Sequence, residues 1–149
     1  MAELLTQYFD SLLITMAVLA VVVYVALHFV TAGYGMMYNK RWGLTVNNRL
    51  GWVLMEAPAF IVMFALWWAS GRRFEAAPMV MAMLFLLHYF QRSFIFPMLI
   101  RGKGRMPWSI ILMGVIFNSI NAVMQGGWIF YVSAPDRYPT SWLCSPQFI

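Results

Sequence analysis

One apolar stretch of this chain, residues 86–107, carries an unusual number of polar side chains. It reads LLHYFQRSFIFPMLIRGKGRMP. Four polar residues there crowd into little more than one helical turn: His88, Tyr89, Gln91 and Arg92. A phenol is a neutral hydrogen-bond donor, so it can be buried at low cost. A buried donor of this kind can stabilise negative charge that develops on a bound oxygen atom.

Glu56 and Arg92 are the two charged residues that lie well inside apolar runs of the sequence. A charge at the centre of a bilayer costs about 2.5–3.5 kcal/mol on insertion scales, so such groups face a cavity or a partner. Two interpretations stay open. The two residues form a plain ion pair that locks two helices together, or they belong to a functional site.

The elements that position these groups are predicted to be membrane-spanning helices. The sequence is 62% hydrophobic and 10% charged, whereas soluble domains carry about 25% charged residues. A spanning helix needs about 20 mostly apolar residues. We therefore expect an all-α integral membrane protein, one membrane domain over residues 1–149, with four transmembrane helices at about 9–32, 50–70, 76–100 and 108–132.

The distribution of basic residues predicts how these helices are oriented. No Lys or Arg precedes the first helix, and most basic residues lie in the first and third loops: Lys40, Arg41, Arg49, Arg101, Lys103 and Arg105. Basic loops mark the cytoplasmic side, so the N-terminus is expected outside the cytosol. Arg72 and Arg73 in the second loop run against this rule. Short loops favour a bacterial inner membrane, with the endoplasmic reticulum as the alternative.

The end of the sequence resembles the beginning of another helix. Ser145 followed by Pro146 fits an N-cap with proline at the first helical position. We expect residues 145–149 to start a truncated fifth helix and the chain to be the front part of a longer protein. A frayed, amphipathic terminus stays open as the alternative.

Polar groups from three predicted helices fall at similar depths in the membrane. With a helical rise of about 1.5 Å per residue, Glu56 lies about 9 Å and Arg92 about 12 Å from the cytosolic side, while Tyr89 and Asn118 lie about 16 Å deep. We expect a deep polar pocket that opens toward the cytosol.

Several of these residues also have structural interpretations that stay open. Asn118 and Asn121 share a face of the fourth helix and could hydrogen-bond between helices, a common use of amides in membranes. His88 could be a core histidine. Arg101 and Arg105 could determine topology or bind phosphate.

At these residues the sequence resembles the 3-oxo-5α-steroid 4-dehydrogenases, also called steroid 5α-reductases. The segment WVLMEAPAF, 52–60, is similar to the family's tryptophan-containing Gln-Glu-Leu-Pro segment. The segment HYFQRSFIFPMLIRGKGRMP, 88–107, resembles the family's HYFHR signature, and NAVMQGGWIFY, 121–131, its asparagine-to-glutamine-glycine segment. The resemblance covers about residues 33–132. Met55 and Gln91 depart from it, because they stand where the family has glutamine and histidine.

The resemblance implies a fold and a reaction. The family has seven membrane helices, an N-terminus outside the cytosol and an NADPH site open to the cytosol. It reduces the Δ4 double bond of 3-oxo steroids: hydride goes to C5 and a proton reaches C4. The family's catalytic tyrosine and glutamate, which bind the 3-keto oxygen, correspond here to Tyr89 and Glu56.

The remaining site residues follow from position and type. Side chains expected at the substrate are mostly aromatic: Trp52, Phe60, Phe85 and Asn118. Side chains expected at NADPH are basic or polar: Arg92, Arg101, Arg105 and Asn121. Most cofactor-binding residues are expected beyond residue 149, and no metal is expected.

Other functions remain as alternatives. Relatives that reduce enoyl-CoA or polyprenol double bonds are not separated by the sequence. A transporter or channel subunit could use Glu56 and Arg92 as an ion path, and a haem carrier or a structural subunit is less well supported. The single cysteine, Cys144, excludes a disulfide framework and dithiol chemistry. Nucleic acid is not an expected partner, because cytosolic loops explain the basic charge.

Overall fold

The computed structural model describes residues 2–30, 42–102, 104–146 and 148. Four helical segments are long and apolar enough to cross a membrane, as the sequence predicts. The first is α1, Ala2–Phe29, and the second is α2, Asn48–Ala69. The third combines α3, Ala76–Phe90, with the π-helical turn η3, Gln91–Ile95, and α4, Phe96–Leu99. The fourth combines α5, Trp108–Gly127, with the π-helical turn η4, Trp128–Val132.

The first helix begins at Ala2 rather than near residue 9. The acidic side chain of Glu3 lies in its first turn, where the helix dipole favours negative charge. Phe9 is buried and packs against Trp128, with ring centroids 5.6 Å apart. The helix therefore continues past the apolar run that predicted it. The expected end at residue 32 lies outside the described residues.

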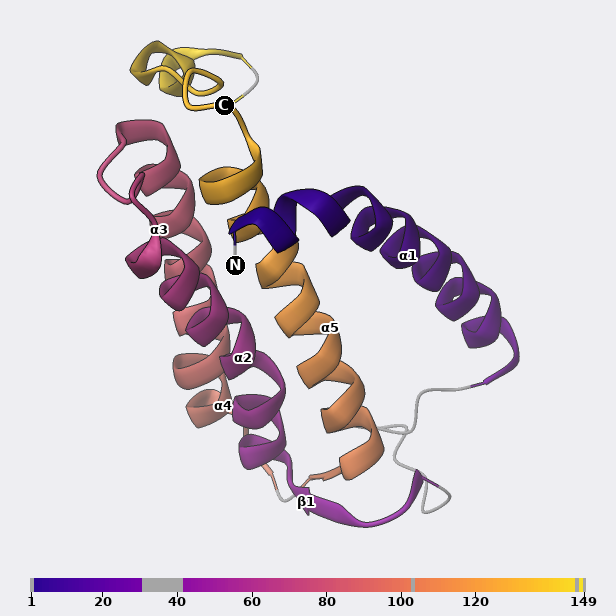
Figure 1. The fold of residues 1–149 in the computed structure, drawn as a ribbon. Helices are drawn as coiled ribbons and strands as arrows, with labels where there is room; N and C mark the ends of the chain where they lie inside the picture. The colour runs from indigo at the N-terminus through magenta and orange to yellow at the C-terminus, as the bar shows by residue number, and fades with distance from the viewer. Residues whose placement is uncertain (1, 31–41, 103, 147, 149) are drawn as a thin grey trace.

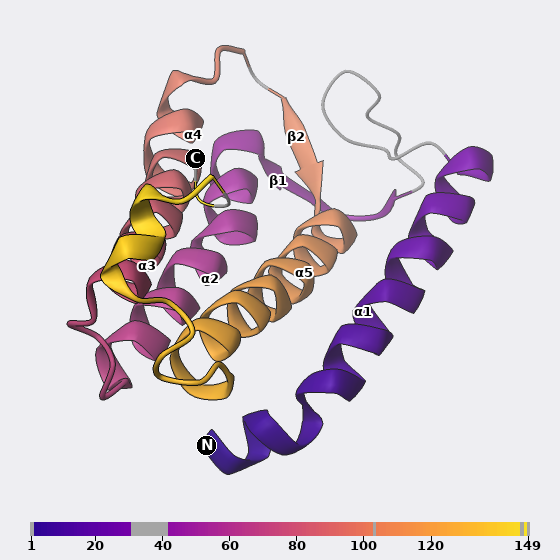
Figure 2. The same ribbon diagram turned by 90° about the horizontal axis from the view of Figure 1, so that it is seen from above.

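α2, α3 and α5 pack together, whereas α1 stands apart over most of its length. Figure 1 shows α1 crossing α5 near the end of that helix, and Figure 2 shows the rest of α1 lying apart from the other helices. The most apolar window of α1 has no buried residue. The side chains that position the candidate site therefore come from α2, α5 and the third span.

Small residues let α2 and α5 approach closely. Gly114 and Gly126 on α5 lie against α2, where an added Cβ would meet Met55 and Leu66 respectively. Ala122, between them on the same stripe, is fully buried in the main core. Small residues at such spacing are typical of helix contacts in membranes, because they bring the backbones together.

A two-stranded antiparallel sheet, which was not expected from the sequence, joins the beginnings of α2 and α5. Its strands are β1, Thr45–Asn47, and β2, Arg105–Pro107, and Thr45 pairs with Pro107. Asn47 and Pro107 are also the N-cap residues of α2 and α5. The sheet therefore sets the relative position of the two helices (Figure 2).

The π-helical turn η3 interrupts the third span directly after Tyr89. Pro97 has no N–H to donate to the carbonyl of Ser93, and its ring would crowd that carbonyl. The N–H of Phe96 instead donates to the carbonyl of Gln91, five residues earlier. Such turns rotate the side chains that follow relative to a regular α-helix, and they are frequent at functional sites.

The loop between α2 and α3 uses its two arginines structurally. The Arg72 guanidinium donates to the backbone carbonyls of Ile129 and Ser133, 3.1 and 2.9 Å away, and pairs with Glu75 at 2.9 Å. Arg73 donates to the carbonyl of Trp68 at 3.0 Å. These bonds satisfy carbonyl groups at the ends of helices. These structural bonds explain why Arg72 and Arg73 occur in a loop that the topology rule assigns to the outside.

The chain ends in the short 3₁₀-helix η5, Thr140–Cys144. Ser145 follows it in an extended conformation and is its C-cap. Residues 147 and 149 lie outside the described residues, so the predicted fifth helix stays a prediction.

Candidate active site

Glu56 lies at the centre of a polar cluster between α2, α5 and the third span. It is 3% exposed, and among the described residues it is the only charged residue that is buried. Its Oε1 accepts from Nε of Arg92 at 2.9 Å, and its Oε2 accepts from Nδ2 of Asn118 at 3.3 Å. The ion pair that the sequence left open is therefore formed. Each of the two carboxylate oxygens therefore accepts a hydrogen bond, one from the third span and the other from α5.

Tyr89 joins the same cluster from α3. Its hydroxyl donates to Oδ1 of Asn118 at 3.4 Å and accepts from Nδ2 of Asn121 at 3.0 Å. Asn118 also donates to the backbone carbonyl of Met55 at 2.8 Å. Glu56 and Tyr89 are thus linked through one amide, that of Asn118. The two asparagines do bridge helices, and both also contact a predicted catalytic residue.

Aromatic rings line the cluster. The Arg92 guanidinium lies over Trp52, 5.3 Å from the ring centroid, and Trp52 meets Phe96 edge to face at 5.1 Å. Phe85 lies against Tyr89, with centroids 4.5 Å apart. Phe60 instead packs with Phe90 and Phe94 in an aromatic group one helical turn beyond Glu56. The rings exclude water from one side of the cluster, which strengthens its hydrogen bonds.

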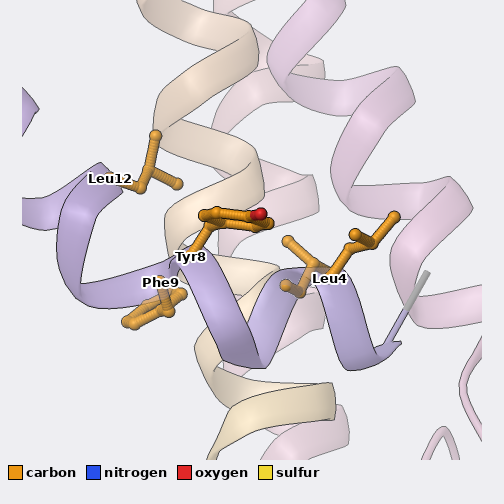
Figure 3. A pocket seen from close by; sticks show the side chains of 5 residues that line it. Leu4, Tyr8, Phe9 and Leu12 are labelled. Atoms are coloured by element: carbon orange, nitrogen blue, oxygen red, sulfur yellow. The ribbon is translucent and has the colours of Figure 1, made fainter.

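The cluster has an open side. The side chain of Arg92 is 43% exposed, whereas that of Glu56 is 4% exposed. A separate apolar hollow lies on α1, at the N-terminal end of the chain, and Figure 3 shows the side chains that line it: Leu4, Leu5, Tyr8, Phe9 and Leu12. This hollow has no polar group of the candidate site, so we place no chemistry there.

The four residues predicted to bind the cofactor do not lie together. Arg92 and Asn121 are part of the polar cluster. Arg101 is exposed in the segment between α4 and β2. Arg105 lies on β2, where its guanidinium donates to the backbone carbonyl of Thr45 at 2.9 Å and to its hydroxyl. Arg101 and Arg105 therefore belong to the end of the bundle that carries the β-sheet, away from Glu56 along α2.

Two features of the cluster escaped the sequence analysis. The backbone carbonyl of Met55 orients Asn118, and no side-chain pattern marks a backbone acceptor. The π-helical turn sets the direction of Arg92. Pro97 was the available signal, because a proline inside a helix predicts a local change in its hydrogen bonds.

The arrangement suits the binding of a carbonyl group that becomes negatively charged. Tyr89 supplies a neutral O–H donor beside an amide and a carboxylate in an apolar surrounding. In such surroundings a donor aimed at a developing oxyanion contributes more than it does in water. His88, which is exposed, lies edge to face against Tyr89 at 5.1 Å.

Comparison with known proteins indicates the family. No family model matches the chain. The steroid 5-alpha-reductase DET2 of Gossypium hirsutum is 30% identical over 125 residues, 81% of this chain and 48% of that protein. The 3-oxo-5-alpha-steroid 4-dehydrogenase 1 of Bos taurus is 31% identical over 144 residues, 94% of this chain and 55% of that protein. The protein of the same name from Homo sapiens is 31% identical over 108 residues, 71% of this chain and 40% of that protein.

These similarities agree with the apolar helices, and together they describe a multi-pass membrane protein. The chain is thus similar in sequence to the steroid 5α-reductases, as its three motifs indicated, and it spans about half the length of the curated relatives it matches.

Proposed function

We propose that this chain supplies the ketone-binding part of an enzyme that reduces the Δ4 double bond of 3-oxo steroids with NADPH. The observation that carries the proposal is the link between Tyr89 and Glu56 through Asn118. The names of the similar proteins support the same substrate class. Because the chain spans about half the length of these relatives, we propose this for the whole protein to which the cluster belongs.

The reaction places negative charge on one oxygen atom. Hydride adds to C5, the electron pair of the C4–C5 double bond shifts toward C3, and the carbonyl oxygen gains the charge. The resulting enolate then takes a proton at C4. Tyr89 donates its O–H to the oxygen, so the barrier falls because this donor is already in place.

Glu56 supports the Tyr89 hydroxyl indirectly, through Asn118. Its carboxylate accepts from Arg92 and Asn118, so it holds the amide that lies next to the Tyr89 hydroxyl. A carboxylate has no proton to donate to a ketone, and it could bond the substrate oxygen directly only in its protonated form.

The basic residues of this chain could bind only part of a dinucleotide cofactor. Arg101 is exposed and would hold a phosphate group, and Arg105 could assist while it keeps its bonds to Thr45. Both lie at the sheet end of the bundle, whose basic residues we assign to the cytosolic side. When bound, NADPH supplies the hydride. The other groups that bind it would come from the rest of the protein.

We also infer an N-terminus outside the cytosol. The start of α1 and the loop between α2 and α3 lie at one end of the bundle, and β1 lies at the other (Figure 1). Arg49, Arg101 and Arg105 belong to the sheet end. The membrane we propose is a bacterial inner membrane, with the endoplasmic reticulum as the alternative.

A Tyr89→Phe variant tests the proposed role of the phenol. We expect its turnover of a Δ4-3-oxo steroid to fall about 100- to 1,000-fold, as when one oxyanion donor is removed. Turnover is measured by mass spectrometry of the full-length protein with NADPH, since the product gains two hydrogens. Tyr131→Phe is the control, because it removes one phenol bond to the carbonyl of Leu66 outside the cluster. Near-wild-type turnover in Tyr89→Phe would rule out the assigned role.

A further inference from the structure

The hydrogen bonds around Tyr89 determine where its proton can point. A phenol has one proton to donate and lone pairs that accept. Nδ2 of Asn121 donates to the Tyr89 oxygen at 3.0 Å. With the Asn121 amide in this orientation, the proton of Tyr89 points away from Asn121, toward another acceptor.

That acceptor is Asn118, and its own amide can lie only one way round. The two groups beside its nitrogen, the carbonyl of Met55 at 2.8 Å and the carboxylate of Glu56 at 3.3 Å, are both acceptors. Amide oxygen and nitrogen are assigned from such networks, and here only the nitrogen satisfies both neighbours. Its oxygen Oδ1 therefore faces the hydroxyl of Tyr89.

The bond between Tyr89 and Asn118 is long. Its O···O distance is 3.4 Å, whereas O–H···O bonds in proteins usually measure about 2.7–2.8 Å. A ketone oxygen that arrives at the usual distance would be a better acceptor than Oδ1. The proton of Tyr89 therefore points toward Oδ1 of Asn118, but the hydrogen bond between them is weak.

We propose that Asn121 and Asn118 are positioning residues that aim the Tyr89 proton at the substrate carbonyl. Asn121 occupies the acceptor side of the phenol, and Asn118, held by Glu56 and Met55, offers a weak acceptor that the ketone replaces. This inference rests on the proposed reduction of 3-oxo steroids. It assigns Asn121 to the substrate-binding tyrosine rather than to the cofactor.

An Asn121→Asp variant reverses the direction of the key hydrogen bond at nearly constant shape. Asp offers acceptors to Tyr89, so the proton turns toward residue 121 and away from the ketone. We expect kcat to fall about 100-fold, with a much smaller change in KM. Asn121→Leu removes the donor without adding an acceptor, so we expect its loss of kcat to be smaller. Gln125→Glu is the matched control, because it makes the same chemical change at an exposed position one turn along α5.

A second measurement follows the bond itself. The infrared carbonyl stretch of a Δ4-3-oxo steroid labelled with ¹³C at C3 falls in frequency when a donor bonds the oxygen. Bound to the full-length wild-type protein without NADPH, the steroid should show this lower frequency. The shift should disappear in Tyr89→Phe and in Asn121→Asp, although both variants still bind the steroid.

The outcomes separate this inference from the proposed function. If the wild type reduces the steroid and Asn121→Asp keeps both its kcat and the infrared shift, the positioning role is wrong and the function stands. If Asn121→Asp unfolds more easily while its kcat is unchanged, the asparagine only joins helices, and the inference is again wrong. If the wild type neither binds nor reduces the steroid, the proposed function fails, and the inference fails with it.

Discussion

Glu56 shows how a carboxyl group can be accommodated inside the bundle. Burying a carboxylate costs several kcal/mol unless donors replace its water. Here Arg92 and Asn118 each occupy one of its oxygens. Helical rise alone placed these three groups at comparable depths, since depth along a helix is a local property. Which atoms would bond depended on helix packing, and so the partners of each oxygen required the structure.

Removing Arg92 should cost more stability than neutralising Glu56. Arg92→Met leaves a buried carboxylate without its cation. We expect the free energy of unfolding to fall by about 2–3 kcal/mol. Breaking a fully buried ion pair costs more, but Arg92 is partly exposed. Glu56→Gln should cost less, since its amide oxygen can still accept from Asn118. The measurement is denaturant unfolding of the full-length protein in detergent.

The double variant completes this test. Arg92→Met combined with Glu56→Gln removes both charges, so it should regain most of the stability that Arg92→Met loses. An Arg92→Met protein as stable as the wild type would show that the ion pair does not hold the third span against α2.

The contact between α2 and α5 positions the asparagines of the site. Gly114 lies directly against Met55, whose carbonyl orients Asn118. Hydropathy predicted both helices, because a spanning segment must satisfy its backbone internally and cover itself with apolar side chains. It did not predict the strands β1 and β2, because three paired residues on each side have no periodic signal that stands out from a loop.

Gly114→Ala should separate these two helices. The added Cβ would meet Met55 at less than van der Waals distance, and overpacking of this kind costs about 1–3 kcal/mol. We also expect lower turnover, because Asn118 moves with α5. Thermal unfolding and the mass assay report the two effects.

Two further variants serve as controls for Gly114→Ala. Gly71→Ala adds the same methyl group in open space and should leave stability and turnover close to wild type. Gly114→Ala combined with Met55→Ala makes room for the methyl and should recover part of the loss. If Gly114→Ala is as stable and as active as Gly71→Ala, close packing at this point does not position the site.

At the scale of the whole molecule, the residues of the polar cluster contact one another, but one side of the cluster is exposed. Three helices surround Glu56, while Arg92 remains partly exposed and α1 stands away from the site (Figure 2). The matched residues make up about half the length of the similar proteins. The three motifs predicted the similarity to the steroid 5α-reductases because they occur in the same order along the chain. They could not predict how the cofactor binds, because Arg101 and Arg105 lie apart from the cluster.

The most direct test of the central claim follows the hydride in intact membranes. Vesicles that contain the full-length protein receive a Δ4-3-oxo steroid and NADPH that carries deuterium at the transferred position. We predict a product with one deuterium at C5, formed only when NADPH reaches the cytosolic face. Deuterium at another carbon would contradict the binding of the 3-keto oxygen by Tyr89 and its neighbours, and no product with NADPH on that face would contradict the inferred orientation.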